Sequence, residues 1–103
     1  MSTRLDTLLQ FYKDDPNDPF NIYALAIEYQ KTDIKKSLEY FNLLLSDHEH
    51  YVPTYYHAAK LLQETGETER AVIVYEKGIA VAKSQNDLKA ARELQSAYDE
   101  MMF

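Results

Sequence analysis

Apolar side chains recur every three or four residues along nearly the whole chain, the spacing of one face of an α-helix. Ile22, Leu25, Ala26 and Tyr29 are one example. Six segments follow this spacing, at about residues 3–13, 19–31, 34–45, 53–62, 68–82 and 88–101. Residues 72–74 are all β-branched, which is also typical of a strand, but the helical spacing continues beyond them and favours a helix.

The residues at the segment boundaries are typical of helix ends. Pro19 fits the first turn of a helix, where the missing N–H costs nothing. Asp33 fits an N-cap, and Thr3 with Asp6 resembles a capping box. Only two Gly and three Pro occur, and the hairpin dipeptides Asn-Gly, Asp-Gly and Gly-Gly are absent from the sequence. We therefore predict an all-α fold of six helices joined by short loops.

Comparison of the chain with itself shows an internal repeat. A shift of 33 residues places Ile22, Leu25, Ala26 and Tyr29 on Tyr55, Ala58, Ala59 and Leu62. A shift of 34 residues places Ser37, Leu38, Phe41 and Leu45 on Ala71, Val72, Tyr75 and Ile79. Two helical hairpins with a period near 34 are therefore in register.

This pattern resembles the tetratricopeptide repeat (TPR) family, whose 34-residue unit places small and aromatic residues at fixed positions of two helices. The resemblance implies a right-handed α-α superhelix of TPR-like hairpins in one domain. Its parts would be an N-terminal helix (1–18), repeat 1 (19–51), repeat 2 (52–85) and a C-terminal capping helix (86–103). The small residues Ala26, Ala59 and Ala71 would let neighbouring helices approach closely.

The resemblance also implies a binding surface, because the first helices of such hairpins line a concave groove. Transferred by position, the exposed residues of these helices are Phe20, Tyr23, Ile27, Gln30 and Lys31, then Tyr56, His57, Lys60, Gln63 and Glu64. Tyr23 and Tyr56 occupy equivalent positions, and tyrosine suits recognition because it offers a large contact area and a hydroxyl. The alternative is that both rings pack against adjacent helices and shield the core.

One TPR activity is disfavoured by the residues present. Modules that grip the acidic C-terminal peptide of heat-shock chaperones use Lys, Asn and Arg at fixed first-helix positions. Those positions here hold Tyr23, Ile27 and His57. We therefore expect no carboxylate clamp of the chaperone-binding type.

Charge and composition narrow the choice of partner and compartment. Eleven Lys and Arg against seventeen Asp and Glu give a net charge of −6, which disfavours nucleic acid and anionic lipid. Without cysteine, disulfide scaffolds, Cys-ligated zinc and thiol catalysis are excluded. No apolar run approaches the ~20 residues of a membrane span, and the N-terminal sequence lacks the apolar stretch of a secretory signal. We expect a cytoplasmic protein.

The three histidines raise the question of a metal site. His48 and His50 lie in the run Asp-His-Glu-His at residues 47–50, and His57 follows in the next helix. Imidazoles with carboxylates can bind zinc or nickel, and a metal-dependent hydrolase is one alternative function. The spacing matches no helical metal motif, so we expect a polar connector with no metal and no cofactor. No Gly-rich phosphate loop or Gly-x-Ser-x-Gly elbow occurs, and we expect no enzyme activity.

These patterns predict a non-catalytic module or scaffold that binds a protein or peptide segment in the groove of its first helices. The alternative is a structural protein whose repeats mediate homo-oligomerisation. A homodimer could form through the apolar C-terminal cluster of Tyr98, Met101, Met102 and Phe103.

Overall fold

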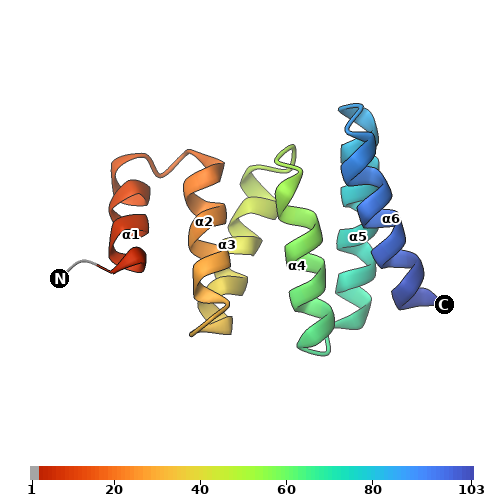
Figure 1. Ribbon diagram of the computed structural model, residues 1–103, viewed down its shortest axis with the longest axis horizontal. Helices are drawn as coiled ribbons and strands as arrows, with labels where there is room; N and C mark the ends of the chain where they lie inside the picture. The colour runs from red at the N-terminus through yellow and green to blue at the C-terminus, as the bar shows by residue number, and fades with distance from the viewer. Residues whose placement is uncertain (1–2) are drawn as a thin grey trace. The chain divides into compact units, whose positions relative to one another are not determined.

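The structure is a computed structural model that describes residues 3–103. Within this range it contains six α-helices and no strand (Figure 1). The helices are α1 (Arg4–Asp14), α2 (Pro19–Tyr29), α3 (Ile34–Asp47), α4 (Pro53–Glu64), α5 (Thr68–Ser84) and α6 (Leu88–Met102). The predicted all-α class is therefore confirmed, and the β-branched run at 72–74 is helical, within α5.

The helices form two units. Unit 1 contains α1 to α3 and ends at Tyr51, and unit 2 begins at Val52 and contains α4 to α6. In unit 1, α2 and α3 pack as a helical hairpin and α1 packs on α2. In unit 2, α4 and α5 form the hairpin, and α6 packs on both of them. Each unit thus holds one hairpin and one further helix, and the right-handed superhelix remains a prediction.

The helix ends follow the chemistry of the boundary residues. The Asp6 amide donates to Thr3 Oγ1 and the Thr3 amide donates to Asp6 Oδ2, both at 3.1 Å, which completes the predicted capping box. Asp33 Oδ1 accepts from the Lys36 amide at 3.1 Å and caps α3. Pro19 is the first residue of α2, as predicted. The end of α2 was placed two residues too late by the spacing, because the chain turns after Tyr29 to reach the Asp33 cap.

The core of unit 1 joins its three helices. Leu8 of α1 packs with Leu25 and Tyr29 of α2, and the half-buried Tyr40 of α3 lies against this cluster. The Ser37 hydroxyl, itself buried, donates to the Ala26 carbonyl oxygen at 2.6 Å and ties α3 to α2.

The core of unit 2 is built around large aromatic rings and very small residues. Tyr55 and Tyr75 are almost fully buried, and Ala59 and Ala71 have no exposed surface. Gly78 lies where α5 approaches both α4 and α6, since a Cβ at that position would meet side chains of both helices. Small residues therefore permit close helix contacts here, as expected for two of the predicted alanines.

Candidate functional site

A groove lies between α4 and α6 in unit 2. Its cavity has a volume of about 390 Å³ and is lined by Tyr56 of α4 and by Arg92, Glu93, Ser96, Ala97 and Glu100 of α6. The α6 residues are spaced so that they share one face of that helix. We call this cavity and its lining residues the α4–α6 groove.

The Tyr56 ring is held in place by its neighbours on α4. Its ring centroid lies 5.6 Å from that of His57, with the two planes at 81°. Lys60 Nζ lies 5.9 Å from the Tyr56 centroid, within reach of a cation–π interaction. Tyr56 remains 37% exposed, so the ring is oriented from within the helix while part of its surface is accessible.

The groove combines charges of both signs with groups that stay neutral. Arg92 faces Glu93 and Glu100 in the lining, and Lys60 adds a second cation beside the Tyr56 ring. Burial lowers the pKa of His57, which favours the uncharged imidazole near neutral pH. The groove can therefore offer both hydrogen bonds and ion pairs to a ligand.

Tyr75 connects the core of unit 2 to one of the predicted binding residues. Its hydroxyl donates to Gln63 Oε1 at 3.3 Å. Burial is the main cause that raises the pKa of Tyr75 to about 12, and the neighbouring Tyr56, Glu100 and Glu64 add to it. Gln63 is thus partly occupied by a contact inside the unit.

The predicted binding residues of unit 1 lie on α2 and directly after it. Phe20 is 59% exposed, whereas Tyr23, Ile27 and Gln30 are half-buried. The Tyr23 ring packs edge-on against Tyr51, with centroids 5.8 Å apart. At this position the structure shows ring packing within the unit, the alternative that the sequence left open for Tyr23.

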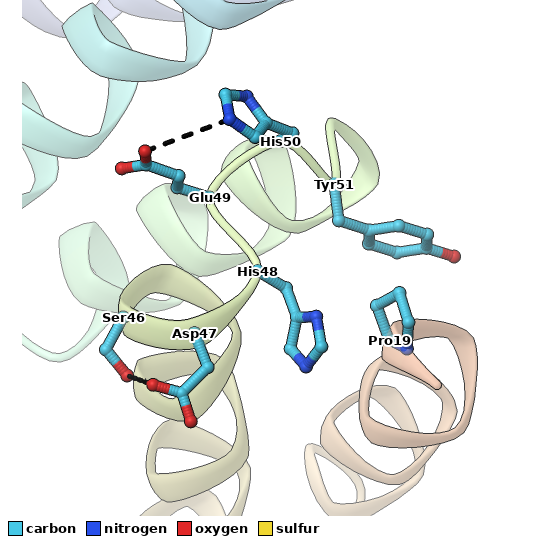
Figure 2. A pocket seen from close by; sticks show the side chains of 7 residues that line it. All are labelled: Pro19, Ser46, Asp47, His48, Glu49, His50 and Tyr51. Atoms are coloured by element: carbon cyan, nitrogen blue, oxygen red, sulfur yellow. Dashed lines mark hydrogen bonds and ion pairs between the residues drawn. The ribbon is translucent and has the colours of Figure 1, made fainter. Parts of the chain in front are cut away.

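Tyr51 also lines a second cavity, at the loop that follows α3 (Figure 2). This loop cavity has a volume of about 640 Å³, and its lining consists of Pro19 and residues 46–51. In Figure 2, His48 and Tyr51 extend toward Pro19, whereas Glu49 and His50 lie on the other side of the loop.

The loop cavity does not gather metal ligands. His50 Nε2 lies 3.9 Å from Glu49 Oε1, and Figure 2 shows the His48 imidazole pointing away from this pair. In residues 3–103, no group of three or more His, Cys, Asp or Glu side chains is placed to hold a metal ion. The structure therefore offers no geometry for the alternative of a metal-dependent hydrolase.

Comparison with solved structures gives the family. A tetratricopeptide repeat domain protein from Salinibacter ruber, solved by NMR, is 40% identical, with a TM-score of 0.80 over 84% of this chain and 89% of that one. The chain belongs to the tetratricopeptide repeat family. A crystal structure of a Salinibacter ruber TPR domain protein is 38% identical, with a TM-score of 0.78 over 82% of this chain and 96% of that one.

A protein from Bordetella parapertussis shares the fold at 20% identity, with a TM-score of 0.82 over 99% of this chain and 90% of that one. No family model and no curated protein sequence matches the chain. The predicted TPR resemblance and the TPR-like helical fold are confirmed by the structural neighbours.

The TPR assignment explains which groove residues the sequence did not single out. Glu93, Ser96 and Glu100 lie on α6, which the sequence treats only as a cap. A helix in the position of a TPR first helix should present a binding face like the others, and this was the signal available. Tyr51 had no such signal, because it lies in a loop outside the repeat positions. In the part of the chain that the structure covers, no helix has the length and apolar character needed to cross a bilayer.

Proposed function

We propose that this TPR module binds an extended segment of another protein in the α4–α6 groove, without catalysis and without a cofactor. TPR repeats serve as protein-interaction modules, which gives the general class. The observation that carries the proposal is the cavity between two helices that both hold first-helix positions, with Tyr56 on one wall and a polar face of α6 on the other.

The lining of the groove suits recognition of a peptide. A partly exposed tyrosine gives a rigid apolar surface with a hydrogen-bonding tip at low cost in rotamer entropy. Lys60 and His57 fix the ring before a ligand arrives, so little ordering is left for the binding step. Arg92, Glu93 and Glu100 can pair with charges or backbone groups of the bound segment and set its register.

Unit 1 supplies a second contact surface in this proposal. Phe20 is the most exposed of its predicted binding residues, and Ile27 and Gln30 lie on or directly after the same helix. The half-buried Tyr23 would contribute through the edge that Tyr51 leaves accessible.

Selection from a displayed library of random peptides tests the proposal. Selected peptides are synthesised with a fluorophore, and their affinity is measured by fluorescence polarisation. We expect Tyr56→Ala to raise the Kd by about tenfold or more, as for a central aromatic contact. Ile73→Ala is the matched control, because Ile73 is 63% exposed but lies on the second helix of the hairpin.

Two results would contradict this function. One is a selection that yields no peptide with reproducible affinity for the folded protein. The other is a set of peptides whose affinity falls equally with Tyr56→Ala and Ile73→Ala, which would place binding outside the groove.

A second candidate function is assembly of identical chains, and the exposed apolar residues of unit 2 favour it. Leu88 is 58%, Met102 46% and Phe103 99% exposed. Such side chains on one helix and its end can bury against another copy. Light scattering after size-exclusion chromatography should then show a dimer that dissociates in Leu88→Lys, and a wild-type monomer at high concentration would contradict this candidate.

A further inference from the structure

The loop cavity of unit 1 is formed by a short segment that turns sharply. The His48 amide donates to the Leu44 carbonyl at 2.8 Å and ends α3, and the Tyr51 amide donates to the His48 carbonyl at 3.0 Å. This turn places residues 46–51 around one cavity together with Pro19, the first residue of α2 (Figure 2). The cavity is thus set by hydrogen-bonded backbone between two helices.

One wall of the cavity is aromatic. The Tyr51 ring is supported by Tyr23, and burial raises the pKa of both phenols, so both remain neutral in the physiological range. Neutral aromatic rings carry negative charge density on their faces and attract cations that come within about 6 Å.

The charges around the cavity have one sign. Asp47 and Glu49 belong to the lining, which contains no Lys or Arg. Asp18 lies close enough to Tyr51 for its charge to contribute to the raised pKa of that phenol. The C-terminal end of α3, at Asp47, adds the partial negative charge of the helix dipole.

The basic residues of the same hairpin lie at its other end. Lys31, Lys35 and Lys36 belong to the turn between α2 and α3 and the first turn of α3, whereas the cavity lies where α2 begins and α3 ends. Among the printed ion pairs, Glu49 meets His50 at 3.9 Å, an interaction that carries charge only when the imidazole is protonated. The cavity therefore keeps a negative potential near neutral pH.

We propose that the loop cavity binds an arginine side chain from a segment of a partner protein. A guanidinium group is planar, stacks on aromatic rings and pairs with a carboxylate through two hydrogen bonds, whereas an ammonium group does only the last of these, and with one donor at a time. The Tyr51 ring beside Asp47 and Glu49 offers both kinds of contact in one cavity. The net charge of −6 would speed the approach of a basic segment.

This site is in unit 1 and is independent of the proposed α4–α6 groove. Its test is an NMR titration of the ¹⁵N-labelled chain with the capped peptide Ac-Ala-Arg-Ala-NH₂. We expect saturable shifts centred on the amides of residues 46–51. The same peptide with citrulline, which keeps the shape but loses the charge, should bind at least about tenfold more weakly, and the lysine peptide should fall between them.

A matched pair of charge variants locates the site. Asp47→Asn with Glu49→Gln removes two charges from the loop cavity and should weaken binding of the arginine peptide by about fivefold or more. Glu67→Gln with Glu69→Gln removes the same charge beside another cavity of unit 2, about 540 Å³, whose lining contains Arg70 and no aromatic ring. This control should change the affinity by less than about twofold.

Tyr51→Leu tests the aromatic wall separately, since it keeps an apolar side chain of similar reach, and the spectrum reports whether unit 1 stays folded. The assignment is overturned if the citrulline or lysine peptide binds as tightly as the arginine peptide. It is equally overturned if the shifts lie outside residues 46–51 and their neighbours, if the two charge variants weaken binding alike, or if no saturation occurs.

Discussion

A methyl group placed on Gly78 would lie 2.5 Å from Cβ and 2.8 Å from Cγ of Tyr55, so α5 passes Tyr55 at a distance that only a glycine allows. The equivalent positions in unit 1 hold a different pair. Ile22 precedes Tyr55 by 33 residues and Leu44 precedes Gly78 by 34. All three of these side chains are at most 1% exposed. One repeat thus combines a large ring with a glycine, and the other combines two aliphatic residues of medium size, which is an exchange of volume between two positions.

We expect Gly78→Ala to destabilise the protein by about 1–3 kcal/mol, the usual cost of overpacking. The sign is informative, because Gly→Ala inside an exposed helix normally stabilises by about 1 kcal/mol. Here the nearest atom is the Cβ of Tyr55, which is fixed to the backbone and cannot move aside. Urea denaturation followed by circular dichroism measures the free energy of unfolding, and a gain in stability would contradict the close contact.

The volume exchange can be tested by transplanting the pair from unit 1. Gly78→Leu should be severely destabilising alone, and adding Tyr55→Ile should restore part of the loss. We expect a coupling free energy of about 1 kcal/mol or more in this double-mutant cycle. Strictly additive effects would show that the two positions do not share space.

Ser37 gives a second prediction about the repeat. Its hydroxyl bonds the Ala26 carbonyl at 2.6 Å in the core of unit 1, whereas unit 2 has Ala71 at the equivalent position. Ser37→Ala should lower the free energy of unfolding by about 0.5–1.5 kcal/mol, because the Ala26 carbonyl keeps a backbone donor at Gln30. Ser84→Ala is the control, since its hydroxyl bonds Val81 near an exposed helix end. An equal loss in both variants would deny Ser37 a special role.

The sequence predicts the parts of this fold that depend on neighbouring residues. The Thr3–Asp6 box and the Asp33 cap are local, since each forms within one helical turn. The buried small residues Ala26 and Ala59 follow from the repeat period, because equivalent positions of a stacked repeat have similar surroundings.

The rest depends on residues that meet only after folding. Tyr23 and Tyr51 are far apart in the sequence, and nothing in the period predicts that their rings touch. Gly78 reads as one more small residue until the position of Tyr55 is known. The α4–α6 groove likewise needs two helices separated by all of α5, so the sequence gives the Tyr56 wall of the groove and not the residues opposite.

Tyr75 predicts a loss of stability at alkaline pH. Its pKa is about 12 in the folded protein, mainly through burial, against about 10 in the unfolded chain, so folding favours the protonated phenol. This contribution is complete below about pH 10 and is lost as the pH rises toward 12, by up to about 2 kcal/mol once solvent screening near the hydroxyl is allowed for.

Tyr75→Phe should therefore be less stable than the wild type near neutral pH, where it lacks the bond to Gln63. Its stability should fall less between about pH 9 and about pH 11, as measured by urea denaturation at both values. Some alkaline loss should remain, because the pKa values of Tyr23, Tyr40 and Tyr51 are also raised by burial. Identical losses in variant and wild type would show that Tyr75 is not the responsible group.

Glu28 fastens α1 to the hairpin of unit 1. Its carboxylate oxygen Oε2 accepts from Arg4 Nε at 3.2 Å and from Lys31 Nζ at 3.1 Å. The bond from Lys31 is the main cause that lowers the pKa of Glu28, so the ion pair stabilises the fold above the ordinary carboxyl pKa and is lost as the pH falls through the lowered value. Glu28→Gln should speed hydrogen exchange of the α1 amides by up to about fivefold, within the range of exposed ion pairs. The difference should shrink in high salt and vanish at acid pH, and Glu39→Gln on the exposed surface of α3 should leave α1 unchanged. Unaltered exchange in α1 of the Glu28 variant would leave the Leu8 contacts with Leu25 and Tyr29 as its main attachment.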